Sequence, residues 1–80
     1  MQEQIRAVLA QHGRLAVDPM GLPAEQDLYA VGLTSHASVT VMLALEDAFE
    51  VEFPEQLLKK STFASVAAMS QALAGLVPVP

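Results

Sequence analysis

Ser35 and His36 are adjacent in the chain, and together they offer a hydroxyl nucleophile and a general base. A serine hydrolase needs such a pair as a minimum. The spacing argues against this chemistry, because consecutive residues of a helix point about 100° apart and no acidic residue is spaced to orient the imidazole. We therefore expect no catalytic residue in this chain, and a small hydrolase is the least favoured of three functional hypotheses.

Ser35 is better suited to carry a phosphate group. A helix is predicted to begin at Thr34 or Ser35, where free backbone amides and the positive end of the helix dipole favour an anion. Val39 and Leu43 follow at helical spacing, so they share the face of Ser35 and form a small apolar patch beside it. An unmodified serine here would simply cap the helix. The combination of cap position and apolar patch favours a modified serine.

Composition excludes several other classes of function. The 80 residues contain no cysteine, so disulfides and thiolate metal ligands are ruled out, and the two distant histidines, His12 and His36, do not predict a metal site. The formal net charge is −5, and the four Lys and Arg residues do not form a cluster. Nucleic acids and anionic membrane surfaces would be repelled. An acidic protein instead suits partners with basic docking surfaces.

The uncharged stretch from residue 61 to residue 80 is long enough to cross a bilayer. Its serines, threonine and glutamine interrupt the apolar character, and two prolines close it. We expect an amphipathic helix followed by a short tail, and no membrane insertion.

The elements that position Ser35 are predicted to be helices. The periodicity of apolar residues, together with capping and breaker residues, predicts a bundle of three longer helices and one short helix. Val51 and Phe53 alternate like a strand, but the run is too short and has no partner strand. The predicted helices cover residues 2–13, 35–49, 55–59 and a last segment that is capped by Ser61 or Thr62 and ends at Gly75. The fold class is all-α, with a domain over residues 1–76 and a flexible tail over residues 77–80.

The long connection between the first two predicted helices contains turn and breaker residues, and Gly13 is expected to end the first helix in left-handed geometry. Five apolar side chains are expected to pin this connection to the core: Leu15, Val17, Leu22, Leu28 and Tyr29.

Two inward-facing stripes are predicted for the later helices. The stripe of the second helix consists of Ser38, Met42, Leu45 and Phe49, with Val41 beside them. That of the last helix consists of Val66, Met69, Ser70 and Leu73. Apolar packing must stabilise this fold, and 52% of the chain is hydrophobic.

The run from Asp27 to His36, DLYAVGLTSH, resembles the attachment loop of acyl carrier proteins. In that family a leucine and a glycine precede an aspartate-serine-leucine triplet that opens the second helix. Residues 41–49 are similar to the second helix of the family, residues 51–54 to its following loop, and residues 61–66 to the start of its last helix. The resemblance extends from about Asp27 to Leu73, with the segments in the family's order.

The resemblance implies that Ser35 carries a covalent 4′-phosphopantetheine arm, which a phosphopantetheinyl transferase attaches from coenzyme A. The thiol of the arm would carry an acyl group as a thioester, so the chain itself would not be an enzyme. Acyl- or aminoacyl-loading enzymes and condensing enzymes of fatty-acid, polyketide or related pathways would be its partners. We expect a cytoplasmic monomer, because a carrier must visit many partners.

Docking in this family commonly uses the second helix and its acidic residues. The residues expected to contact partners here are His36, Val39, Thr40, Leu43, Glu46 and Asp47. Core packing is the alternative for Val39 and Leu43, and a solvated face is the alternative for the acidic residues.

Two positions depart from the family pattern. Thr34 replaces the usual aspartate, and His36 replaces the usual leucine. We infer a specialised carrier rather than the housekeeping carrier of fatty-acid synthesis. An aminoacyl carrier for an amino-acid-activating enzyme remains an alternative, as does an unmodified helical interaction module.

Overall fold

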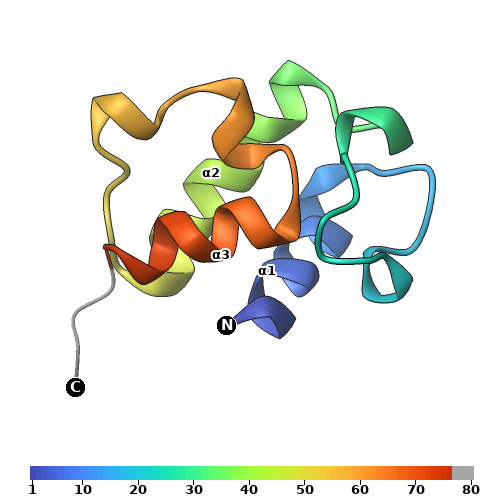
Figure 1. Cartoon of the computed structure of the whole chain (residues 1–80), viewed down its shortest axis with the longest axis horizontal. Coiled ribbons are helices and arrows are strands. Elements are labelled where there is room, and N and C mark those ends of the chain that lie inside the picture. Colours follow the sequence, from blue (N-terminus) through green and yellow to red (C-terminus); the bar gives the residue numbers. More distant parts are fainter. Residues whose placement is uncertain (77–80) are drawn as a thin grey trace.

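The computed structural model describes residues 1–76, and the predicted tail at residues 77–80 lies outside them. Three α-helices form the fold: α1 (Gln2–Val8), α2 (Ser35–Phe49) and α3 (Val66–Ala74). α3 lies in front of α2 in Figure 1, and the connection from residue 14 to residue 34 occupies the end of the molecule opposite the end of α3. No strand occurs within the described residues, so the predicted all-α class is confirmed.

The first helix continues beyond α1 as a wider π-helical coil, Leu9–Gly13, which matches the predicted range of residues 2–13. The expected end geometry is wrong by one residue, because Arg14, with φ 52°, adopts the left-handed conformation. Gly13 instead lies in a tightly packed position. A β-carbon there would lie 3.3 Å from Leu9 Cδ2, in a position that is buried.

Polar bonds as well as apolar side chains hold the long connection in place. The guanidinium of Arg6 donates to the carbonyl oxygens of Pro19 (2.7 Å) and Leu22 (2.6 Å). Leu28 is fully buried, and its amide donates to the carbonyl oxygen of Ala64 at 2.7 Å. Val17 is 43% exposed, so it does not pin the loop as expected. The loop is therefore ordered up to the residues that precede α2.

α2 has the predicted bounds, and Thr34 is its cap, because the Thr34 hydroxyl accepts a hydrogen bond from the Ala37 amide at 3.0 Å. The predicted core stripe is displaced around the helix. Ala37, Val41 and Leu45, spaced four residues apart, are its buried residues. The predicted members Ser38, Met42 and Phe49 are half-buried at the edge of this stripe.

Two short 3₁₀ turns, Glu55–Leu57 and Lys60–Phe63, connect α2 to α3. The expected cap of the last helix is wrong, because Ser65 rather than Ser61 or Thr62 accepts from an amide of its first turn, that of Ala68 at 3.0 Å. The stripe of Val66, Met69 and Leu73 is buried as predicted, whereas Ser70 is half-buried.

The core is a single cluster of apolar side chains from all three helices and their connections. The rings of Phe53 and Phe63 meet edge to face with centroids 5.3 Å apart, which joins the two turns to this core. No helix within residues 1–76 has the length and apolar character to cross a membrane.

Candidate functional site

Ser35 is the first residue of α2 and is exposed. The Thr34 hydroxyl bonds to the Ala37 amide, and the Ser38 amide bonds to the Thr34 carbonyl oxygen at 2.9 Å. The amides of Ser35 and His36 lie in the first turn, where no preceding carbonyl of the helix can accept from them. They therefore point outward at the positive end of the helix. The structure therefore places one accessible hydroxyl at an amide-rich helix start.

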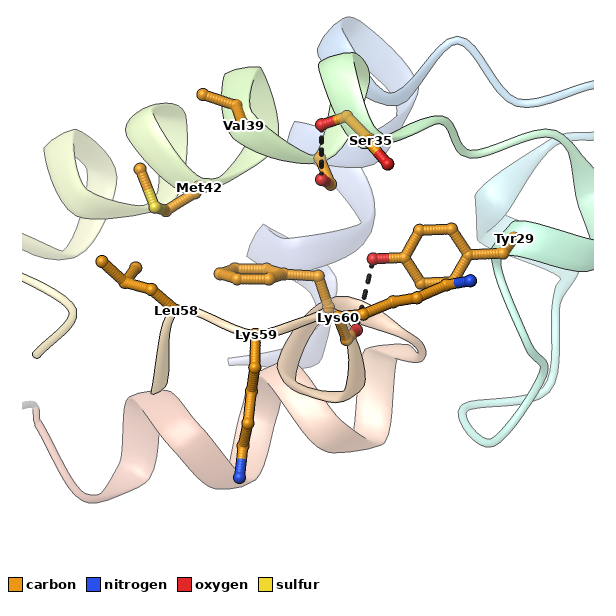
Figure 2. A pocket seen from close by; sticks show the side chains of 9 residues that line it. Tyr29, Ser35, Val39, Met42, Leu58, Lys59 and Lys60 are labelled. Atoms are coloured by element: carbon orange, nitrogen blue, oxygen red, sulfur yellow. Dashed lines mark hydrogen bonds between the residues drawn. The ribbon is translucent and has the colours of Figure 1, made fainter. Parts of the chain in front are cut away.

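A surface groove of about 400 Å³ begins at Ser35. Figure 2 shows Met42 of α2 and Leu58 facing one another across it, while the side chain of Lys59 points away from it. Val39 and Phe63 complete the apolar part of the lining. An extended, partly apolar group attached to Ser35 can lie along this groove.

Tyr29 and Lys60 form the polar end of the same groove. The Tyr29 hydroxyl donates to the Lys60 carbonyl oxygen at 3.2 Å, and Lys60 Nζ lies 4.7 Å from the centre of the Tyr29 ring (Figure 2). These contacts hold the loop before α2 against the turn before α3. The groove consequently has a fixed polar end near the serine.

His36 does not share this groove. It lines a separate, polar cavity of about 380 Å³ that also includes His12 and Thr34. Ser35 lines the groove but does not line this second cavity. The two neighbouring side chains thus serve different surfaces, which agrees with the argument against a Ser35–His36 catalytic pair.

The remaining predicted docking residues are divided between surfaces. Val39, 52% exposed, lines the groove. Thr40, Leu43 and Asp47 are exposed and line cavities on the side of α2 that faces the first helix. The alternative of core packing for Val39 and Leu43 is thereby wrong, because both side chains are more than half exposed.

Glu46 has a structural role that the sequence analysis did not foresee. It is half-buried, and its Oε2 accepts a hydrogen bond from the Phe53 amide at 2.8 Å. This bond fixes the loop after α2 against the helix that precedes it. One oxygen of the Glu46 carboxylate is therefore engaged within the chain, and docking by Glu46 stays a prediction.

Sequence reasoning missed most of the groove. Tyr29, Ser38 and Lys60 line it, although the sequence predicts that Tyr29 and Ser38 pack against the core. The spacing of Ser38 from Ser35, one helical turn, was the available signal. For Tyr29 and Lys60 there was no local signal, because 31 residues separate them in the chain.

The model of the phosphopantetheine attachment site family matches residues 3–73 of the chain. This chain belongs to that family. It is a carrier protein, and its prosthetic group is covalently bound 4′-phosphopantetheine. The family is one of carriers rather than of catalysts, and the fold described above is the fold of its members.

Among similar proteins, an aminoacyl carrier protein from Agrobacterium fabrum (strain C58 / ATCC 33970) is 46% identical over 69 residues, which cover 86% of this carrier protein and 83% of the relative. This chain superposes with a TM-score of 0.90 on a chain of a solved structure. That crystal structure is of an engineered Bradyrhizobium japonicum glycine:[carrier protein] ligase complexed with a carrier protein from Agrobacterium tumefaciens and AMP. Its identity is 43%, covering 92% of this chain and 99% of that one.

A second Bradyrhizobium japonicum ligase structure, with a glycylated carrier protein, superposes with a TM-score of 0.75. In this match the identity is 25%, covering 89% of this chain and 95% of that one. The fold of the carrier protein is thus found in proteins that an amino-acid ligase binds.

The residues at the start of α2 fit a phosphopantetheine group. The Ser35 hydroxyl is exposed, two helix amides are directed outward beside it, and the groove that begins there has apolar walls and a cationic Lys60. A phosphodiester matches the amides and the cation. The pantetheine chain, which is part apolar and part amide, matches the groove.

Proposed function

We propose that Ser35 is the attachment serine of this carrier protein. The supporting observation is a comparison of its five serines. Ser38 Oγ donates to the Ser35 carbonyl oxygen, Ser65 Oγ accepts from an amide, and Ser70 Oγ contacts Met1 Sδ. Ser61 is exposed but lies within a 3₁₀ turn. Ser35 combines exposure with the first position of an α-helix.

The bound group supplies a terminal thiol that carries the cargo as a thioester. The chain's own residues tether, orient and expose it. Ser35 fixes the origin of the arm, the amides of the first turn of α2 stabilise its phosphate, and the groove directs it along the surface. Tethering raises the effective concentration of the cargo at a partner's active site.

Mass spectrometry tests the attachment. After incubation with coenzyme A and a phosphopantetheinyl transferase, the wild type is expected to gain one phosphopantetheine group. Ser35→Ala should gain none, and Ser61→Ala, which removes the other exposed serine hydroxyl, should gain one as the wild type does. An unmodified wild type would instead support the interaction-module hypothesis.

We propose further that the cargo is an amino acid. The names of the relatives support this alternative over the fatty-acid and polyketide pathways. The packing supports it as well, because the centre of the bundle is filled by fully buried side chains such as Leu45 and Met69, and the groove is open at the surface. A small polar aminoacyl group needs no apolar interior, whereas a long acyl chain is stabilised by one.

Loading reactions distinguish the cargoes. The holo-protein is incubated with ATP, a panel of amino acids and the Bradyrhizobium japonicum glycine:[carrier protein] ligase, and the thioester is detected by intact mass. We expect an aminoacyl adduct that hydroxylamine removes. A fatty-acyl loading enzyme tested in parallel is expected to load the protein poorly, and efficient fatty-acyl loading without aminoacyl loading would refute the proposed cargo.

Partner docking also belongs to this proposal, through His36, Val39, Thr40, Leu43, Glu46 and Asp47. The transferase as a partner, the monomeric state, the cytoplasmic location and the division into a domain of residues 1–76 and a tail remain predictions.

A further inference from the structure

Two cavities lie next to one another on the side of α2 opposite the groove. The polar cavity beside His36 and a second one, of about 480 Å³, share Gln11, His12 and Thr40. Together they run between the first helix and α2, whose residues are in contact along this side. We use the name α1–α2 furrow for this surface.

The furrow has different chemistry at its two ends. At the end near the start of α2 it is lined by Arg14, His12 and His36, with no acidic residue in the lining. At the other end it is lined by Val8, Leu43 and Asp47. A cationic end is notable in a protein with a net charge of −5 and four Lys and Arg residues.

Arg14 is the fixed charge of this end. The side chain is exposed, whereas the guanidinium of Arg6 is occupied by two loop carbonyls. Its backbone is left-handed, with φ 52°, which costs a residue with a β-carbon about 1 kcal/mol relative to glycine. An arginine therefore stands where glycine would be less strained.

The two histidines reinforce the same polarity, because each imidazole has at least one N–H donor in any protonation state. His36 is exposed and His12 is half-buried. A ligand that meets this end of the furrow therefore faces a guanidinium and two ring N–H donors. A carboxylate is the partner group that satisfies them.

We propose that the α1–α2 furrow is a docking surface for the enzyme that loads the cargo, and that this enzyme presents carboxylates to Arg14, His12 and His36 and apolar side chains to Leu43. An enzyme that receives the arm from Ser35 must cover the first turn of α2, and the cationic end of the furrow adjoins that turn. The contact has the opposite sign to the acidic helix surface that the sequence analysis expected. This inference rests on the proposed aminoacyl function.

Arg14→Gly is the decisive variant, since it removes the side chain and relieves the left-handed backbone. The matched control is Glu50→Gly, which relieves the other left-handed helix end, at φ 55°, away from the furrow. Neither variant should lower the unfolding temperature. A folding defect is therefore not expected to obscure the result.

Loading kinetics of the holo-proteins with the Bradyrhizobium japonicum ligase provide the readout. We expect the KM for Arg14→Gly to rise about threefold to fivefold with kcat unchanged, Glu50→Gly to behave as the wild type, and Arg14→Lys to recover part of the loss. With His36→Gln added, the rise should reach on the order of tenfold if the two sites contribute independently. Added salt should raise the wild-type KM more than that of Arg14→Gly.

The outcomes separate the two proposals. A wild type that the ligase does not load with any amino acid would refute the aminoacyl function and, with it, the furrow. Normal loading of the wild type with an unchanged KM in Arg14→Gly would refute the furrow alone. An equal loss in Arg14→Gly and Glu50→Gly would also refute it, because a nonspecific effect of glycine at a helix end would then suffice.

Discussion

At the scale of single residues, the start of α2 assigns different tasks to neighbouring side chains. The Thr34 hydroxyl caps the helix, Ser35 faces the groove, and His36 faces the α1–α2 furrow. Threonine satisfies the Ala37 amide without placing a carboxylate next to Ser35, the proposed attachment serine. The departure from the family's aspartate therefore preserves the cap while it removes a negative charge.

Thr34→Ala tests the cap. Loss of the hydrogen bond to the Ala37 amide should lower the free energy of unfolding by about 1 kcal/mol. Thr40→Ala is the control, because the Thr40 hydroxyl is exposed and its bond to the His36 carbonyl oxygen is long, at 3.5 Å. Urea denaturation measures both, and an equal effect of the two substitutions would contradict a capping role for Thr34.

At the scale of elements, two connections position α2. Gly32 has φ 114° in the turn that leads to Ser35, and a β-carbon there would lie 3.1 Å from the Ala16 amide nitrogen. At the other end, the Glu46 carboxylate fixes the loop that follows the helix by accepting from the Phe53 amide. The groove depends on both, since its walls come from segments on either side of α2.

Gly32→Ala should destabilise the protein by about 2 kcal/mol, because it combines a left-handed backbone with a close contact to another backbone segment. Gly21→Ala is the matched control. A β-carbon at Gly21 meets no atom within 4 Å, so the substitution should be neutral or slightly stabilising. Thermal unfolding compares the two, and a stable Gly32→Ala protein would show that this turn adjusts easily.

Glu46→Ala should lower the free energy of unfolding by about 1–2 kcal/mol, since the Phe53 amide loses a charged acceptor in a part-buried position. Glu52→Ala, at an exposed residue of the same loop, should have an effect below about 0.5 kcal/mol. Hydrogen exchange at the Phe53 amide adds a local measurement. Unchanged protection of that amide in Glu46→Ala would contradict the assigned bond.

At the scale of the whole molecule, an 80-residue domain has a small core and a correspondingly small margin of stability. Side chains from all three helices meet in one cluster, and the faces of α2 that line the groove and the furrow carry exposed apolar residues. The buried stripe of α2 thus stabilises the fold, and the exposed faces of the same helix form the groove and the furrow.

Leu45→Ala and Leu43→Ala compare these uses on the same helix. Leu45 is fully buried, so its truncation should cost about 3 kcal/mol, a large share of the stability of a domain of this size. Leu43 is 56% exposed, and its truncation should change the free energy of unfolding by less than about 0.5 kcal/mol. Urea denaturation gives both values, and similar losses would contradict the assignment of the core stripe.

The sequence by itself determined the all-α class, the bounds of α2, the serine that starts it and the family to which the chain belongs. These features depend on spacing within a short segment, where the periods of the helix and the rules of capping act locally. The left-handed residue after the first helix was misplaced by one position and the cap of the last helix by three or four, because several nearby positions offer the same local chemistry.

Only the tertiary structure decided which helix face is buried and what lies opposite each exposed side chain. Tyr29 meets Lys60, Glu46 meets the Phe53 amide, and Arg14 and His12 come to line one cavity with His36. Such pairings depend on how the helices and connections pack, and the spacing within one helix contains no information about its neighbours. The groove and the furrow beside Ser35 are products of that packing.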